Sequence, residues 1–296
     1  MRFVLVILLG IASCFAACKE LAGFGKEVLV ADFWDGKIAY ADIDSLHVRD
    51  LDSGKDILEF KFGNDKITAV AVIQNSVIAG FESGSLVYLE NLSRLAKTQT
   101  LLLDPVKTRM SEPVSSVLRY GEKGDKIVLT LGSKKVATYD LINKIYKIHD
   151  INLGSKVIST ALAGENLIVS CFDRRIYKIN LNNGEKTLLV RAPQIVSALA
   201  VDGDKVAFST IDGRLVINEK ELKFESEIAS LNLKNGLIIA GCANSNLKVL
   251  DANSNLKYDE KITHESIKKV FVYDGGALAI SWGGEVVSCD LNDKQI

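Results

Sequence analysis

Histidine, proline, methionine and tryptophan are scarce in this chain of 296 residues, which contains three, three, two and two of them. The few prolines and an apolar content of 48% exclude a long disordered tail, because disordered segments are poor in apolar residues. The three histidines, His47, His149 and His264, stand far apart with no second ligand at a metal-site spacing. We therefore expect no zinc or copper site.

Catalytic and cofactor motifs are missing as well. The chain has no C-x-x-C pair, no C-x-x-C-H haem attachment, no G-x-S-x-G, no phosphate loop and no G-x-G-x-x-G. Two acidic segments, beginning at Asp50 and Asp251, lack the Gly and Glu that a calcium loop needs at its sixth and twelfth positions. Both are expected to form hairpin turns. We expect no catalytic, metal-binding or cofactor-binding residues, and hence a protein that is not an enzyme.

An excess of charge of one sign is also lacking. Lys and Arg number 36 against 37 Asp and Glu, and no long basic run occurs. Nucleic-acid binding depends on a basic surface that neutralises phosphates. Nucleic acid is therefore not an expected partner.

What the sequence does contain is a short phrase of three apolar residues followed by small or polar ones. It occurs seven times, as IAYAD from Ile38, VIAGF from Val77, IVLTL from Ile127, LIVSC from Leu167, VAFST from Val206, LIIAG from Leu237 and LAISW from Leu278. A repeat of about forty residues built from short strands is typical of a β-propeller. The repeats predict an all-β fold, a seven-bladed β-propeller with degenerate WD40-like repeats, as a single domain over residues 19–296.

The repeats differ in length, and these differences lead to two predictions. The longest spacing falls before the third repeat, so residues 94–113 are expected to form a long loop, a place where contacts are common. The last repeat supplies only three strands before the sequence printed above stops. Because a propeller must close its ring, we expect a segment around residues 20–26 to add the outer strand of blade seven. The alternative is a final blade of three strands.

The first 18 residues have the pattern of a signal peptide. Residues 3–12 are apolar but too few to span a bilayer as a helix. The run Ile11-Ala12-Ser13-Cys14 resembles a bacterial lipobox, with Cys14 as the lipid attachment residue and Cys18 as the alternative. A lipid there would tether the domain to a membrane surface. A soluble secreted protein without lipid is the other interpretation, and both predict the periplasm.

Three further cysteines follow in the repeats, namely Cys171, Cys242 and Cys289. Cys171 and Cys242 belong to the fourth and sixth repeats, which are not neighbours, so their Cα atoms cannot come close enough for a disulfide. We expect all three to be small, buried, free thiols.

With these repeats in view, the chain resembles bacterial WD40-like or quinoprotein-like propellers, and more narrowly the NapL-type accessory propellers encoded with periplasmic nitrate reductase. The likeness covers nearly the whole chain and includes LIVSCFDRRIYKINL from Leu167 and LIIAGCANSNLKVLD from Leu237. The resemblance implies a non-catalytic periplasmic role in nitrate reductase maturation or nitrate respiration, with protein partners and no cofactor. It implies no particular site residue.

Two other functions stay open. One is an envelope assembly lipoprotein of the kind that serves the outer-membrane β-barrel machinery, although this chain is short and lacks the regular Gly and Trp pattern of that family. The other is an enzyme, either a propeller lactonase or a quinone-dependent dehydrogenase. Neither a lactonase metal site nor a quinone pocket can be assembled from a motif in this sequence.

Overall fold

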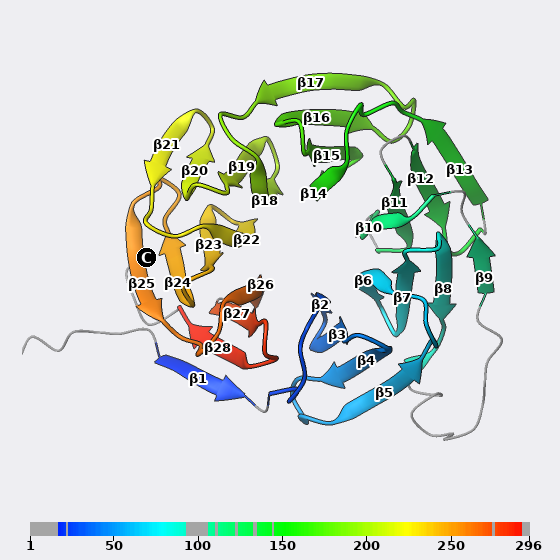
Figure 1. Cartoon of the computed structure of the whole chain (residues 1–296), viewed down its shortest axis with the longest axis horizontal. Helices are drawn as coiled ribbons and strands as arrows, with labels where there is room; N and C mark the ends of the chain where they lie inside the picture. Colours follow the sequence, from blue (N-terminus) through cyan, green and yellow to red (C-terminus); the bar gives the residue numbers. More distant parts are fainter. Residues whose placement is uncertain are drawn as a thin grey trace, which may run out of the picture.

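The seven recurring phrases form the second strand of seven four-stranded antiparallel sheets, which are arranged as a ring of blades around a central channel (Figure 1). The computed structural model describes residues 17–21, 23–92, 106–109, 112–121, 124–132, 135–143, 145–273 and 276–291. The predicted seven-bladed β-propeller is confirmed. No helix in these ranges is long and apolar enough to cross a membrane.

Each blade contains four strands, and the innermost lines the channel. The innermost strands, in the order of the blades, are β2 (Val30–Trp34), β6 (Ile67–Ile73), β10 (Val114–Tyr120), β14 (Val157–Ala163), β18 (Val196–Asp202), β22 (Ile228–Lys234) and β26 (Ile267–Tyr273). The second strands are β3 (Lys37–Ala41), β7 (Ser76–Phe81), β11 (Lys126–Leu131), β15 (Asn166–Cys171), β19 (Lys205–Thr210), β23 (Leu237–Cys242) and β27 (Gly276–Ser281).

The two remaining strands of each blade lie toward the rim. The third strands are β4 (Ser45–Asp50), β8 (Ser85–Leu89), β12 (Lys135–Asp140), β16 (Arg175–Asn180), β20 (Arg214–Ile217), β24 (Asn246–Leu250) and β28 (Val286–Asp290). The outer strands are β5 (Asp56–Lys61), β9 (Val106–Arg109), β13 (Ile145–Asp150), β17 (Lys186–Arg191), β21 (Lys220–Lys223), β25 (Leu256–Lys261) and, in blade seven, β1 (Ala17–Leu21).

The core is divided among the blade interfaces. Seven clusters of buried apolar side chains each join two neighbouring blades. The cluster that contains Phe24, Tyr40 and Ile280 joins blade seven to blade one. The second strands are buried on both faces, as in β7, where all six residues are buried. Burial on both faces explains why these strands have near-continuous apolar sequences.

The ring is closed by the N-terminal strand. β1 pairs antiparallel with β28, so the blue first strand lies beside the red last strand in Figure 1. This confirms the expected closure of blade seven, with the strand about three residues earlier than expected. The expected boundary between residues 18 and 19 therefore falls inside β1, and the propeller includes Ala17 and Cys18.

The expected loop over residues 94–113 was partly wrong. Within it, Val106–Arg109 forms β9, which pairs with β8 and completes blade two. The extra length therefore belongs to blade two, between its third and outer strands. A blade ending at its third strand would expose an unpaired edge, and β9 covers that edge.

The innermost strands share one irregularity. In blades two to seven, a β-bulge follows the first residue of the innermost strand, whereas β2 of blade one has none. Hydroxyl groups at the bulge contact the next blade: Thr68 Oγ1 donates to the Val114 carbonyl at 2.6 Å, and Ser197 Oγ donates to the Ile228 carbonyl at 2.8 Å. The bulges thus tie neighbouring blades together beside the channel.

Candidate functional site

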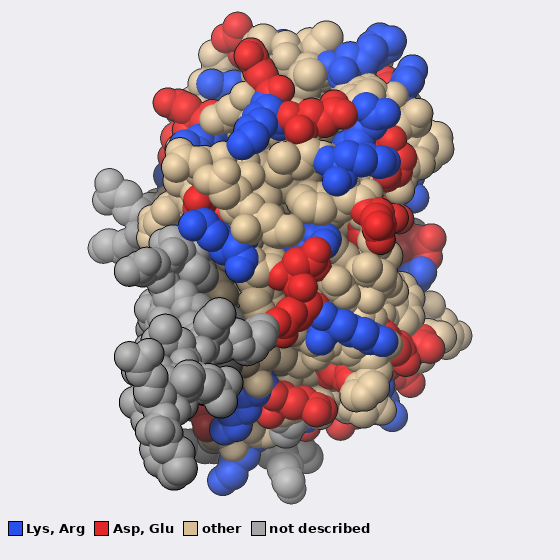
Figure 2. Space-filling model, turned by 90° about the vertical axis from the view of Figure 1, so that its left-hand side faces the viewer, with Lys and Arg blue, Asp and Glu red and all other residues tan. Residues whose placement is uncertain are grey.

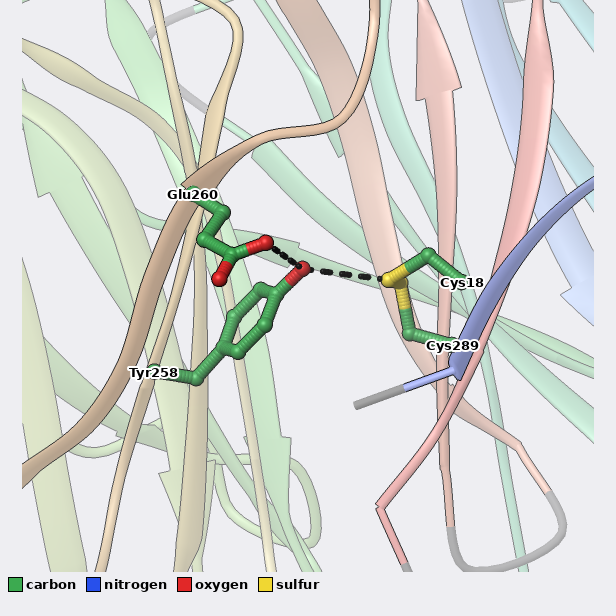
Figure 3. Close-up of a disulfide and its surroundings, with 4 residues drawn as sticks. All are labelled: Cys18, Tyr258, Glu260 and Cys289. Carbon is green, nitrogen blue, oxygen red and sulfur yellow. Dashed lines mark hydrogen bonds between the residues drawn. A yellow bond between two sulfur atoms is a disulfide. The ribbon is translucent and has the colours of Figure 1, made fainter. Parts of the chain in front are cut away.

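Cys14 and Cys18 are the two residues at which the sequence predicts lipid attachment. Cys14 lies outside the described residues. Cys18 lies in β1, directly opposite Cys289 of β28, and the two form a disulfide across 271 residues of sequence (Figure 3). The alternative attachment at Cys18 is incompatible with this bond, because a cysteine in a disulfide has no free thiol to which a lipid could be attached. The expected free thiol at Cys289 was also wrong. The signal-peptide pattern places Cys18 in the leader, so the sequence offers no partner for Cys289.

Tyr258 of β25 lies against the disulfide. Its hydroxyl oxygen lies 3.2 Å from Cys18 Sγ and 3.3 Å from Glu260 Oε2, so the hydroxyl can donate its single hydrogen to either acceptor (Figure 3). Burial, with the nearby Glu260 carboxylate, raises the pKa of Tyr258 to about 12. The phenol therefore stays protonated and able to donate at neutral pH.

Cys171 and Cys242 are both buried and free, as expected. Burial raises the pKa of Cys171 to about 12 and that of Cys242 to about 11. A thiol with so high a pKa contributes almost no thiolate at neutral pH, so both residues are unreactive core groups.

The three histidines occupy separate environments. His47 is buried and pairs with Asp42 at 2.9 Å, His149 Nε2 lies 3.1 Å from the Leu181 carbonyl, and exposed His264 pairs with Glu285. Among the described residues there is no group of three or more His, Cys, Asp or Glu side chains that could hold a metal ion.

The two acidic segments examined for calcium form hairpin turns, as expected. Asp50 Oδ1 accepts the Ser53 N–H at 2.8 Å, and Asp251 Oδ1 accepts the N–H groups of Asn253 and Asn255, each at 2.9 Å. These carboxylates are used to organise the turn between the third and outer strands. Such side-chain-to-backbone bonds are typical of Asp and Asn in turns.

The most developed candidate site lies at one mouth of the channel, where the innermost strands end. Arg119 of β10 reaches across blade two to blade one. Its guanidinium pairs with Asp32 and donates to the carbonyls of Val72 and Phe33, both at 2.9 Å. Asp32 also accepts the Val72 N–H at 2.9 Å. One arginine thereby fixes the innermost strands of three blades relative to one another.

Trp34 lies on this arginine. The Arg119 Cζ atom is 4.3 Å from the centre of the indole ring, within cation–π range, and 40% of Trp34 remains exposed. The turn that follows, Asp35-Gly36, has positive φ at both residues, 47° and 71°, as a two-residue hairpin turn requires. A rigid turn and a bound guanidinium hold the indole with one face toward water.

Two adjoining hollows share Trp34, Arg119 and Asn232, and together we call them the Trp34 cleft. The larger, of about 680 Å³, is lined by Phe33, Trp34, Asp35, Gly36, Asp52, Arg119, Asn232, Lys234, Phe271, Val272 and Tyr273. The smaller, of about 390 Å³, adds Asp32, Val117, Leu118, Tyr120, Gly121, Gly124 and Leu162. The cleft combines aromatic rings with charges of both signs, which suits a mixed polar and aromatic segment of a partner.

Sequence reasoning missed this site. Trp34, the last residue of β2, and Asp35 belong to none of the motifs considered above. Arg119 belongs to no motif, and its partners Asp32 and Val72 come from two other repeats. The signal in the sequence is that Arg119 is the one charged residue of β10, whose other residues are apolar or uncharged.

The surface outside the cleft is mixed in charge. In the view of Figure 2, Lys and Arg alternate with Asp and Glu, and no extended area of one sign is seen on that face.

No protein-family model and no curated protein matches the chain. Among solved structures, it is similar to the computationally designed Ika8 protein, with a TM-score of 0.67, 17% sequence identity, and coverage of 89% of this chain and 83% of that chain. At this identity the likeness concerns the fold alone, and it agrees with the propeller architecture described above.

Proposed function

We propose that this chain is an exported, non-catalytic binding propeller that holds a protein partner at the Trp34 cleft. The observation that carries the proposal is the half-exposed indole of Trp34, held on Arg119 at the mouth of the channel. A fixed aromatic side chain with one free face is a frequent anchor of protein interfaces, because it buries a large area at a small cost in side-chain entropy.

The disulfide supports an exported location. Disulfides persist in oxidising compartments such as the periplasm and are rare where thiols are kept reduced. The Cys18–Cys289 bond is compatible with a lipid on Cys14, because cleavage before Cys14 would leave Cys18 in the mature protein. The proposed location is therefore the periplasm, with or without a lipid anchor.

Periplasmic nitrate reductase and its maturation factors are the first partners to test, since the chain resembles the NapL-type accessory propellers. The test is quantitative affinity purification from the envelope of nitrate-grown cells, with wild-type protein, Trp34→Ala and Ile43→Ala. Ile43 is 82% exposed in the turn between β3 and β4, at the opposite end of the strands from Trp34, and serves as the matched control.

We expect nitrate reductase components with wild-type protein and Ile43→Ala, and their loss with Trp34→Ala at an unchanged melting temperature. Deleting the gene should lower periplasmic nitrate reductase activity. Recovery of outer-membrane assembly components instead would favour the envelope assembly alternative. Equal recovery of the same partners by all three proteins would remove the Trp34 cleft from the proposal.

A further inference from the structure

Blade seven departs from the other bulged blades at the channel wall. After each bulge, one residue of the innermost strand faces one residue of the second strand. In blades two to six both are small: Ala69–Gly80, Ser116–Thr130, Ser159–Ser170, Ala198–Ser209 and Ser230–Gly241. In blade seven the pair is Lys269–Ile280, and the bulge residue itself is Lys268. Lys269 therefore replaces a small residue, and the bulge residue next to it is a second lysine.

These lysines do not make the inter-blade hydrogen bonds that Thr68 and Ser197 make at their bulges. Within the part of the chain that the structure describes, neither Lys268, Lys269 nor nearby Lys66 has a carboxylate at ion-pair distance or a hydrogen bond from its amino group. Lys66 directly precedes β6 of blade two, and Lys268 is the second residue of β26, so both belong to the end of the channel where the innermost strands begin.

Trp282 forms a wall beside this cluster. It follows β27, is 39% exposed, and has the Lys268 Nζ atom 4.1 Å from its ring centre. Because the Trp34 cleft lies where the innermost strands end, Trp282 and the three lysines lie at the opposite mouth.

The charges that act on Lys268 are those of two other lysines. Burial lowers the pKa of Lys268 to about 8, and the charges of Lys269 and Lys66 act in the same direction. Desolvation also lowers the pKa of Lys269, although part of its surface is exposed, and the Asp32 charge opposes this shift. Like charges gathered in a partly desolvated place destabilise the folded state unless an anion compensates them.

The carboxylates near this mouth have other partners or positions. Glu285 is paired with His264, and Asp32, which lines the Trp34 cleft at the other mouth, is paired with Arg119. The Glu265 carboxylate lies over Gly283. None of the carboxylates contributes to the charge environment of Lys268 as strongly as the two lysines do.

We propose that Lys66, Lys268 and Lys269, beside Trp282, form a binding site for a phosphate or sulfate group at the mouth of the channel opposite the Trp34 cleft. Lysine ammonium groups bind such oxyanions as point charges with three donors each. The anion would satisfy donors that the folded chain leaves unused, and it would hold Lys268 in its charged form against the indole.

The test uses Trp282 as its own reporter. The chain has two tryptophans, so Trp34→Phe leaves Trp282 alone. In that background, sodium phosphate is titrated at constant ionic strength, maintained with sodium chloride, while Trp282 emission and the melting temperature are recorded. Lys268→Gln and Lys269→Met are the site variants, and Lys205→Gln, an exposed lysine at the start of β19, is the matched control.

We expect a saturable change in emission with a rise in melting temperature. Losing one charged donor should weaken binding by about tenfold or more in each site variant, and Lys205→Gln should leave binding unchanged. Glycerol phosphate in place of inorganic phosphate distinguishes a site for a phosphate ester from one for the free ion. Sulfate keeps a constant charge near pH 8. In a pH titration of Lys268 followed by Trp282 emission, sulfate should therefore move the midpoint upward from about 8.

The proposal is overturned if emission follows ionic strength alone, or if neither anion changes it. It is also overturned if both site variants bind phosphate as tightly as the control variant. The circular dichroism spectrum and melting temperature of each variant, recorded without phosphate, separate loss of binding from loss of folding.

Discussion

Several polar contacts converge on the buried carboxylate of Asp42. It accepts the Ser45 N–H at 2.8 Å, pairs with His47 at 2.9 Å and with Lys26 at 3.2 Å. His47 stacks on Tyr40, which stacks on Phe24 at the interface between blades one and seven. Through these contacts one buried carboxylate organises the turn between β3 and β4 and supports a blade interface.

Replacing Asp42 with Ala should lower the free energy of unfolding by about 2–4 kcal/mol, because it leaves a buried histidine and backbone N–H groups without an acceptor. Asp42→Asn keeps an acceptor oxygen and should cause about half that loss. Urea unfolding of the two variants and the wild type measures both effects. Equal stability of Asp42→Ala and wild type would show that the network contributes nothing.

At the scale of elements, the turns between third and outer strands depend on ionised carboxylates. Hydrogen bonds from the following backbone lower the pKa of Asp251 to about 2, and hydrogen bonds from Asn143 and Ser53 lower those of Asp140 and Asp50. In the unfolded chain these groups titrate near their ordinary pKa of 3.8. They therefore stabilise the fold above that pH, and this stability is lost as pH falls through the folded pKa.

The urea concentration at the unfolding midpoint should accordingly decrease as the pH is lowered from about 4 to about 2. The decrease should be smaller in Asp251→Asn, because asparagine cannot ionise. Far-UV circular dichroism during urea unfolding at several pH values measures this difference. A urea midpoint that stays constant over this interval, or falls equally in both proteins, would contradict the assigned role of the turn.

The second strands were predictable from the sequence because burial on both faces gives them a near-continuous apolar run. The outer strands were harder. β9 has the sequence VKTR, which contains no apolar run, and it follows an insertion. β17 contains an apolar run, but all six of its residues are exposed. The Trp34 cleft could not be predicted, because Arg119, Asp32 and Asn232 come from three repeats and meet only when the ring is closed.

At the scale of the whole molecule, the ring is held closed by the pairing of β1 with β28 and by the disulfide within that pair. Every other blade takes its four strands from one continuous stretch of sequence. Blade seven instead combines β1 near the start of the sequence with β26, β27 and β28 near its end. Ring closure therefore connects residues 271 apart in sequence, which is where a covalent link constrains the unfolded chain most.

Replacing both Cys18 and Cys289 with Ser should lower the free energy of unfolding by about 3–5 kcal/mol. Cys171→Ser, which alters a buried free thiol in another blade, is the control for introducing a hydroxyl into the core. Denaturant unfolding under non-reducing conditions measures both. If the double variant is no less stable than Cys171→Ser, the disulfide does not secure the ring.

A disulfide joins the first and last strands of the propeller, which we propose is exported. Peptide mapping by mass spectrometry, without reduction, of protein recovered from the cell envelope tests it most directly. Cys18 and Cys289 should appear in one linked peptide pair, and Cys171 and Cys242 as thiols that react only after unfolding. Unlinked thiols at Cys18 and Cys289, or a lipid on Cys18, would contradict the account.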